Sequence, residues 1–225
     1  CSEPTRAGIE RALGRDRVYF LPYYTACPVT REQVADVPAG PRPLNIGFLG
    51  RLVSTKGIEI VTALSLRPEL ADIRWHIHGE GPEYPEKHFT QFPNIRYHGP
   101  YRDLPRHGEI LRSLDAVALF SIHNEGMPLS LIEAMSAGLP WIATDRGGTR
   151  ELARAPQNCV VLPHPVTPDS AATGVATLAR RIRSGDTSRR AQRAAYDEAF
   201  APEVVSRQWF DCLEAARYPS SPAQA

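Results

Sequence analysis

The balance of charges in this 225-residue chain argues against a large binding surface for nucleic acid or an anionic membrane, because 26 basic and 25 acidic side chains leave a formal net charge of +1. Hydrophobic residues make up 42% of the chain and charged residues 23%, which is typical of a folded globular protein of one or two domains. No apolar run reaches the roughly 20 residues of a membrane-spanning helix, and no charged and then apolar leader opens the chain.

The cysteines indicate the redox environment. Cys1, Cys27, Cys159 and Cys212 are widely scattered and form no C-x-x-C pair, which fits neither a zinc site nor a dense disulfide framework. The sequence therefore favours a reducing, cytoplasmic location, with peripheral attachment to the inner face of a membrane left open for the full-length protein. Because the first residue is Cys rather than Met, we expect the chain to be a fragment of a longer protein.

The amino-terminal part of the chain contains a predicted helix at residues 4–14 and a short predicted strand at residues 17–22. The stretch "DVPAGPRP", residues 36–43, is rich in Pro and Gly and is typical of a linker.

The central part of the chain alternates between predicted strands and helices. Short apolar runs that end in Gly, Pro or polar residues predict buried strands at 44–50, 73–79, 94–99, 115–120, 139–144 and 158–163. Apolar spacings between them predict helices at 57–70, 84–92, 104–114, 128–137 and 148–155. This alternation predicts an α/β fold with a parallel sheet of about six strands and helices on both faces. In such a fold, ligands bind beyond the carboxyl ends of the strands.

The carboxyl-terminal part changes to helices alone. Amphipathic patterns predict helices at 171–185, 187–200 and 202–218, and residues 219–225 form a tail that we expect to be loose.

Two glutamates stand in the stretch "NEGMPLSLIEAMSAG", residues 124–138. Glu125 lies just before the predicted helix, Pro128 suits its first turn, and Glu133 lies inside it among apolar residues. The unpaired N–H groups at the helix start favour an anion, and Gly126 lets a ligand approach the backbone. A phosphate that carries a sugar would use this helix start and both carboxylates. The alternative is that Glu125 is a loop acid and that Glu133 points to water.

Two cations follow the first strand of the predicted sheet. Arg51 and Lys56 lie in the loop of "GFLGRLVSTKGIEIV", where they can neutralise a diphosphate without a metal ion, or they are solvated loop cations. The loop is not a P-loop, and Gly47 and Gly50 do not form G-x-G-x-x-G. The absence of both motifs argues against two candidate functions, a nucleoside triphosphatase and a dinucleotide-dependent dehydrogenase.

Four segments in this order resemble the nucleotide-sugar half of the retaining group 1 glycosyltransferases of the GT-B fold. They are "GFLGRLVSTKGIEIV", "HIHGEGPE", "YHGPYRDLP" and "FSIHNEGMPLSLIEAMSAGLPWIATDRGGTREL", and the resemblance spans about residues 44–154. Its most specific part is the pair of glutamates eight positions apart. The predicted sheet is accordingly expected to be Rossmann-like and to form one half of a GT-B fold.

The resemblance assigns roles to these residues. It implies that Arg51 and Lys56 bind the donor diphosphate and that Glu133 binds the ribose. Glu125 would be the catalytic residue, which acts by holding the transferred sugar in position. The main chain around the phosphate and sugar would come from Gly126, Met127, Pro128 and Leu129. The implied donor is a UDP- or GDP-linked sugar, transfer is of the hexosyltransferase kind, and neither a metal ion nor a cofactor takes part.

The resemblance also implies how the chain is divided. Residues 1–38 would be a remnant of the acceptor domain and a linker, and 39–200 the donor-binding domain. Residues 201–218 would form the crossover helix, and 219–225 the tail. The rest of the acceptor domain would be the missing amino-terminal partner, so we expect the fragment alone to have little activity. Trp209 and Phe210 either pack in the core or have lost a packing surface in that domain.

Three interpretations of function stay open beside a glycosyltransferase. A sugar phosphorylase of the GT-B type would need a lysine-bound pyridoxal phosphate, which nothing in the sequence marks. A noncatalytic nucleotide-sugar-binding or interaction module would keep only the fold, and a Rossmann oxidoreductase lacks its glycine fingerprint. His76 and His78 are assigned to packing or to a satisfied surface position, because no spacing completes a metal site. Gly147 and Gly148 are assigned to a tight turn.

Overall fold

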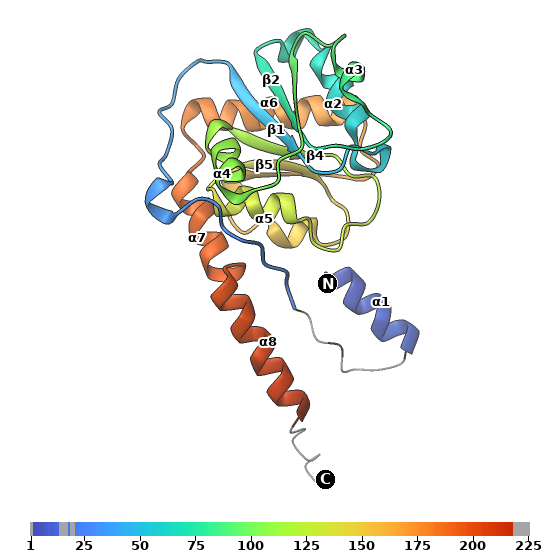
Figure 1. Cartoon of the computed structure of the whole chain (residues 1–225), viewed down its shortest axis with the longest axis vertical. Helices are drawn as coiled ribbons and strands as arrows, with labels where there is room; N and C mark the ends of the chain where they lie inside the picture. The colour runs from blue at the N-terminus through green and yellow to red at the C-terminus, as the bar shows by residue number, and fades with distance from the viewer. Residues whose placement is uncertain (1, 14–17, 19–20, 218–225) are drawn as a thin grey trace.

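Six parallel strands form a single sheet in the order β3-β2-β1-β4-β5-β6 in the computed structural model, which describes residues 2–13, 18 and 21–217 (Figure 1). The strands are β1 (Leu44–Leu49), β2 (Ile73–His78), β3 (Ile95–Gly99), β4 (Ala116–Leu119), β5 (Trp141–Thr144) and β6 (Cys159–Leu162). Each adjacent pair runs parallel. All six predicted strands and the predicted α/β, Rossmann-like fold are therefore confirmed.

Helices lie on both faces of the sheet, with α2 and α6 on one face and α4 and α5 on the other (Figure 1). The helices are α1 (Glu3–Leu13), α2 (Ile58–Ser65), α3 (Glu86–Phe89), α4 (Leu104–Ser113), α5 (Leu129–Ser136), α6 (Pro168–Ser184), α7 (Arg189–Ala199) and α8 (Pro202–Arg217). Capping explains several starts, since Asp103 caps α4, Thr167 caps α6 and Ser188 caps α7 through their side-chain oxygens.

The structure replaces one predicted helix and shortens others, among them the helix predicted at 57–70, which is reduced to Ile58–Ser65. Residues 148–155 form only a 3-10 turn, Thr149–Leu152, because Gly147 has a positive φ of 56° and Pro156 disfavours helical geometry in the residue before it. The helix predicted at 84–92 is reduced to α3, which lies between Pro85 and Pro93. The strand predicted at 17–22 and the tail at 219–225 lie largely or wholly outside the described residues, and Val18, Leu21 and Pro22 are not part of a strand.

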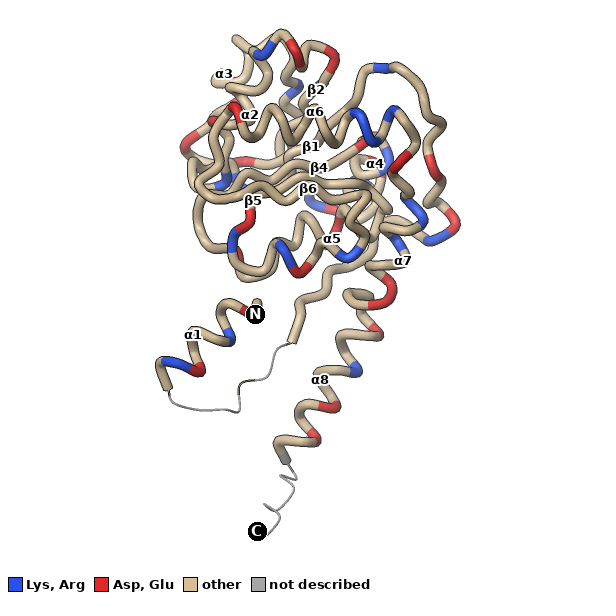
Figure 2. Tube along the Cα trace, turned by 180° about the vertical axis from the view of Figure 1, so that it is seen from behind, with Lys and Arg blue, Asp and Glu red and all other residues tan. Residues whose placement is uncertain are grey.

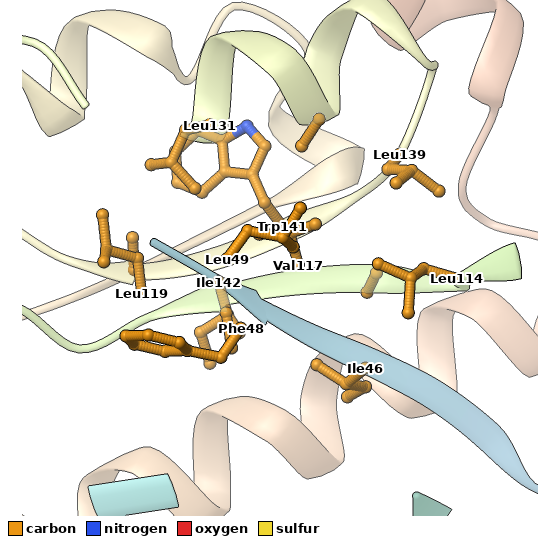
Figure 3. Close-up of a cluster of buried hydrophobic side chains, with 14 of the residues drawn as sticks. Ile46, Phe48, Leu49, Leu114, Val117, Leu119, Leu131, Leu139, Trp141 and Ile142 are labelled. Carbon is orange, nitrogen blue, oxygen red and sulfur yellow. The ribbon is translucent and has the colours of Figure 1, made fainter. Parts of the chain in front are cut away.

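The core lies between the sheet and the helices of both faces. Every residue of β4 and β5 is buried, which explains why these strands are continuous apolar runs rather than alternating ones. Ile46 and Phe48 point toward α6, while Trp141 lies with Leu131 of α5 on the opposite face (Figure 3). Burial on both faces fixes the sheet and thereby the positions of the loops at its carboxyl edge.

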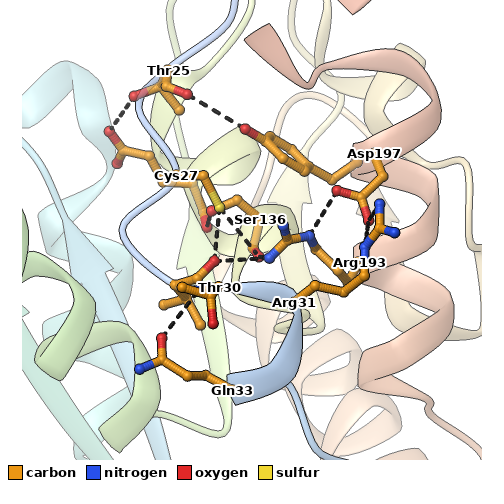
Figure 4. A network of polar contacts seen from close by, with 11 residues as sticks. Thr25, Cys27, Thr30, Arg31, Gln33, Ser136, Arg193 and Asp197 are labelled. Atoms are coloured by element: carbon orange, nitrogen blue, oxygen red, sulfur yellow. Dashed lines mark hydrogen bonds and ion pairs between the residues drawn. The ribbon is translucent and has the colours of Figure 1, made fainter. Parts of the chain in front are cut away.

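Residues 25–34 form a strap that packs on the sheet domain rather than standing free as a linker. Val29 is 1% exposed and belongs to the hydrophobic core. Arg193 of α7 donates to the carbonyl oxygens of Val29 and Ser136, at 2.8 and 2.9 Å, and its Nε donates to Asp197 (Figure 4). Asp197 also pairs with Arg31 of the strap at 2.9 Å. The strap is thus held against α5 and α7.

The α1 and α8 helices project away from the sheet (Figure 1). Trp209 and Phe210 of α8 are 43% and 67% exposed, so these two residues do not pack in the core. Their packing against an acceptor domain stays a prediction. Basic and acidic residues are interspersed over the molecule (Figure 2), as the near-zero net charge predicts. Among the described residues, no helix is long and apolar enough to cross a bilayer. The cytoplasmic location stays a prediction.

Candidate active site

The loop after β1 lies against the end of β4. The backbone N–H of Ile122 donates to the carbonyl oxygen of Thr55 at 3.0 Å, and His123 Nδ1 lies 3.1 Å from the same oxygen. Gly57, at the start of α2, has a φ of 79°, and a Cβ atom there would lie 2.2 Å from the carbonyl oxygen of Phe120. Only glycine permits this close approach, which brings Lys56 to the carboxyl end of β4.

Lys56 and Glu125 form an ion pair at this edge of the sheet. Lys56 Nζ donates to Glu125 Oε1 at 2.6 Å, and the buried hydroxyl of Ser121 donates to the same oxygen. His123 Nε2 lies 3.7 Å from it. The side chain of Glu125 is only 9% exposed, and a buried carboxylate needs such partners to stay ionised. We call Lys56, Ser121, His123 and Glu125 the Glu125 cluster.

The second oxygen of Glu125 is available to a ligand. Oε2 makes no hydrogen bond or ion pair with any residue that the structure describes. The backbone of Glu125 is held from behind, since Gly148 N–H donates to its carbonyl oxygen at 3.2 Å. A Cβ at Gly147 would lie 1.6 Å from that oxygen, so Gly147 and Gly148 do more than make the turn that we predicted. They let the two loops meet and fix Glu125.

The α5 helix starts beside Glu125. It spans Leu129–Ser136, with Pro128 as its N-cap residue, and so it is one residue shorter at each end than the predicted 128–137. Its first N–H groups have no partner within the helix and carry the positive end of the helix dipole. Met127 is buried, Leu129 is 47% exposed, and only the ring of Tyr23 lies near the open side of Gly126. This arrangement suits an anion at the backbone of residues 126–129.

Glu133 lies one turn into α5 in a different setting. Its Oε1 accepts from the hydroxyl of Thr25 at 3.3 Å, and its Oε2 lies 3.5 Å from His107 Nε2. Burial raises the pKa of Glu133 to about 7 and lowers the pKa of His107 to about 4, so at neutral pH this contact is not an ion pair. The ring of Tyr101 stacks on His107 with centroids 4.6 Å apart. We call Thr25, Tyr101, His107 and Glu133 the Glu133 cluster.

Arg51 is placed differently from Lys56. It is exposed and makes no ion pair within the described part of the chain, although its charge helps to lower the pKa of the exposed carboxyl of Glu83. The loop itself is fixed by backbone bonds, as Leu52 N–H donates to the Glu80 carbonyl oxygen at 3.0 Å. The structure therefore brings Lys56 and Glu125 together and leaves Arg51 in the same loop without contact to either.

Sequence reasoning missed three residues of the two clusters. Ser121 follows β4, so the rule that ligands bind at carboxyl ends could have found it. His107 lies on α4, and Thr25 is 108 positions from Glu133 in the chain. No local pattern connects either of them with Glu133, because only the packing of α4 and the strap on α5 brings them there.

Residues 43–181 match the family model described as glycosyl transferases group 1. The chain belongs to this family. A curated relative of the chain, provisionally named colanic acid biosynthesis glycosyltransferase WcaL of Escherichia coli K12, is 24% identical over 93% of the chain. The match covers 54% of WcaL, so the chain spans about half the length of this relative.

Solved structures share the fold of this chain. The lipopolysaccharide outer core galactosyltransferase WaaB has a TM-score of 0.75 at 18% identity, over 96% of this chain and 60% of WaaB. Anabaena HepE, solved in complex with UDP-glucose, has a TM-score of 0.64 at 18% identity, over 96% of this chain and 54% of HepE. The GT-B-like fold is thereby confirmed.

Proposed function

We propose that this chain is the donor-binding part of a retaining glycosyltransferase, which transfers a sugar from a UDP- or GDP-linked donor to an acceptor. The observation that carries the proposal is the Glu125 cluster. It joins a cation, a buried carboxylate with one unpaired oxygen and the start of a helix at the carboxyl ends of β1 and β4. The UDP-glucose complex of HepE, a neighbour in fold, supports this choice of ligand.

The ion pair suggests how the site responds to the donor. Without ligand, Lys56 is held by Glu125 at 2.6 Å. A diphosphate would offer Lys56 a second anion and would also accept from the backbone N–H groups of residues 126–129. Arg51, which is exposed in the same loop, would turn toward the phosphates. Glu125 would then be free to accept hydrogen bonds from the hydroxyls of the transferred sugar.

Glu133 has properties that suit the ribose. Its carboxyl group has no cation beside it, and His107 Nε2 has no hydrogen-bond partner among the described residues. Buried polar groups of this kind normally have partners. Ribose hydroxyls, which both donate and accept, would complete the hydrogen bonding of Glu133 and of His107.

The proposed chemistry depends on charge and position. The positive groups, Lys56, Arg51 and the start of α5, would stabilise the diphosphate as it leaves the anomeric carbon. Glu125 would hold the sugar hydroxyls while positive character develops at that carbon. In this proposal neither a metal ion nor a cofactor takes part in the transfer, and the anomeric configuration is retained.

The acceptor is proposed to bind mainly in a part of the protein outside this chain. The exposed apolar side chains of α8, Trp209, Phe210 and Leu213, line a groove of about 590 Å³ together with Pro22, Tyr23, Tyr24, Leu129 and Ser206. We assign this groove to packing against the amino-terminal acceptor domain. Transfer needs donor and acceptor in one water-poor site, so the chain alone should bind donor with little turnover.

Titration calorimetry with UDP, GDP and ADP and with their sugar conjugates tests the proposal. We expect one of the three nucleotides to bind, together with its sugar conjugates. Lys56→Met should lower this affinity at least about tenfold, because a charge-assisted hydrogen bond to the diphosphate is lost. Lys87→Met, which removes the exposed lysine of α3, is the matched control and should bind as the wild type does. Binding of no nucleotide, or equal binding by both variants, would contradict the proposed site.

A noncatalytic nucleotide-sugar-binding module is the second candidate, because the chain spans about half of WcaL. The two candidates differ when the acceptor domain is supplied. A glycosyltransferase would then release nucleotide in an acceptor-dependent way, whereas a binding module would not. Efficient transfer by the 225-residue chain alone would show that the acceptor domain is not needed.

A further inference from the structure

Three histidines lie together on the face of β2 and β3 that is turned toward α4. His76 and His78 share this face because side chains alternate along a strand. An irregularity in the register at Ile77 and His78 sets His78 opposite Gly99 and brings His98 between the other two rings. The ring centroid of His98 lies 5.2 Å from that of His76 and 4.4 Å from that of His78. One ring nitrogen from each histidine lies within 4.8 Å of the others.

Hydrogen bonds orient His76 toward this cluster. His76 Nε2 lies 3.1 Å from Asn45 Oδ1, which can only accept, so Nε2 carries the proton. Nδ1 is therefore the nitrogen with the lone pair, and it faces His98 Nε2 at 3.0 Å. When a histidine binds a metal ion through one ring nitrogen, its other ring nitrogen usually donates a hydrogen bond to an oxygen such as a carbonyl.

His78 has no such partner. Its side chain is buried, and neither ring nitrogen makes a hydrogen bond with any residue that the structure describes. An imidazole nitrogen without a proton is the form that coordinates a metal ion.

We propose that His76, His78 and His98 bind a zinc ion. Three imidazoles and an open fourth position are an established zinc environment, with Zn–N distances of about 2.0–2.1 Å and ligand nitrogens about 3.3 Å apart. The rings of His76 and His78 stack on His98 at interplanar angles of 7° and 6°, so zinc binding requires the rings to turn until one nitrogen of each points at the ion. His98 is exposed, so the ion can enter and a water molecule can take the fourth position. Mg²⁺ and Ca²⁺ prefer oxygen ligands and are excluded.

The charged surroundings set the expected strength of the site. Arg74, Arg96 and Arg106 place positive charge near the cluster, and Asp115 opposes it. We therefore expect weaker binding than at a zinc site with acidic neighbours. The ion would tie the edge strand β3 to β2 beside the loop that begins at Gly79. It would act on stability and not in the proposed sugar transfer.

The histidine spacing along the chain did not indicate this site. His76 and His78 alone are too few ligands, and His98 is 20 positions beyond His78. Strand pairing and the register irregularity bring His98 beside His76 and His78, which the sequence assigned to packing or to a satisfied surface position.

Calorimetry and thermal unfolding of the chelator-treated chain with Zn²⁺ alone test the proposal. We expect one equivalent to bind and the Tm to rise by about 5–10 °C when free zinc exceeds the Kd about 100-fold. His98→Ala removes an exposed side chain and should fold while losing this rise. His164→Ala, an exposed histidine outside the cluster, is the matched control and should keep it. Mg²⁺ should give no rise.

Cobalt absorption separates this site from the cysteines. Co²⁺ bound by three imidazoles should give d–d bands without the thiolate charge-transfer band that Cys27 or Cys212 would cause. The proposal would be overturned by any of three results. These are a thiolate band in the cobalt spectrum, an equal rise in Tm for His98→Ala and the wild type, and the absence of zinc binding by the wild type. Because these measurements use no nucleotide, they do not depend on the proposed function.

Discussion

The Glu125 cluster lies just before the start of α5 and the Glu133 cluster lies one turn into this helix. Both contain a buried glutamate, but the two carboxyl groups have different partners. Glu125 is buried beside Lys56 and receives hydrogen bonds from Lys56 and Ser121 on one oxygen. Among the described residues, the carboxyl group of Glu133 meets the hydroxyl of Thr25 and the imidazole of His107 but no cation, and burial raises its pKa to about 7. One carboxylate is matched by a cation, while the other is kept partly protonated by burial.

The difference shows two ways in which a protein can accommodate a buried carboxyl group. Either a neighbouring cation pairs with the carboxylate, or the pKa of the group rises and part of the population is protonated. An ion pair keeps the carboxylate charged and ready to accept hydrogen bonds. Burial without a cation leaves a group that can also donate when it is protonated. The proposed division between sugar and ribose uses both kinds, and the predictions below test whether the two clusters differ in this way.

The largest expected effect is on the pH dependence of stability. The folded-state pKa of Glu133, about 7, lies above its ordinary value of 4.5, so its favourable contribution is complete below pH 4.5 and is lost as the pH rises through 7. We expect Glu133→Gln to become more stable relative to the wild type between pH 5 and 8, by up to about 3 kcal/mol. Urea unfolding at both pH values measures this. Glu109→Gln, on the exposed surface of α4, is the control, and an equal change in both variants would remove the contrast.

The second effect is on the stability of the Glu125 cluster. Lys56→Met leaves a carboxylate that is 9% exposed without its cation, and we expect a loss of about 2 kcal/mol in the free energy of unfolding at pH 7. Adding Glu125→Gln should restore most of this loss, because the remaining group is neutral. A double-mutant cycle measures the coupling. If the two changes were simply additive, Lys56 and Glu125 would have no energetic coupling and the ion pair would not stabilise the fold.

The third effect concerns ligands and depends on the proposed function. We expect Glu125→Gln to weaken a sugar nucleotide about tenfold, or about 1.4 kcal/mol, while sparing the bare nucleoside diphosphate. Glu133→Gln should weaken both, because both contain the ribose. Calorimetry with the two ligands makes the comparison. Equal losses for both variants on both ligands would refute the division of roles.

The smallest effect is at the strap. The hydroxyl of Thr25 donates to Glu133 and lowers its pKa, against the larger effect of burial. Thr25→Val should therefore raise the pKa of Glu133 further and cost about 0.5–1 kcal/mol at pH 8 but little at pH 5. The pH profile of urea unfolding checks this. Equal destabilisation at both pH values would mean that Thr25 acts only through packing.

Most of the fold was predictable because its signals are local. Six apolar runs separated by turn residues predicted the six strands, and the helix start predicted at residue 104 agrees with α4, which Asp103 caps. The capping signal of Thr167 was missed, since α6 begins at Pro168 and the helix was predicted to begin at residue 171. The exceptions also have local causes, since Gly147 and Pro156 leave room for only a 3-10 turn at 149–152. At the candidate site, the positions of Lys56 and Glu125 followed from the carboxyl-end rule. Their direct pairing did not, because it depends on how two loops meet.

The sequence by itself determined most of the strand and helix pattern, the resemblance to the family and the choice of Glu125 and Glu133 as candidate site residues. Hydrophobic periodicity and motif spacing are properties of residues that are close together in the chain. Only the tertiary structure decided which groups each glutamate meets. Thr25 and His107 reach Glu133 in α5 from two separate segments, and Lys56 reaches Glu125 from a third. Burial raises the pKa of Glu133. The histidines of β2 and β3 follow the same rule, since the sheet register places His98 beside His76 and His78. Charge and coordination depend on distances in space, which spacing along the chain does not specify.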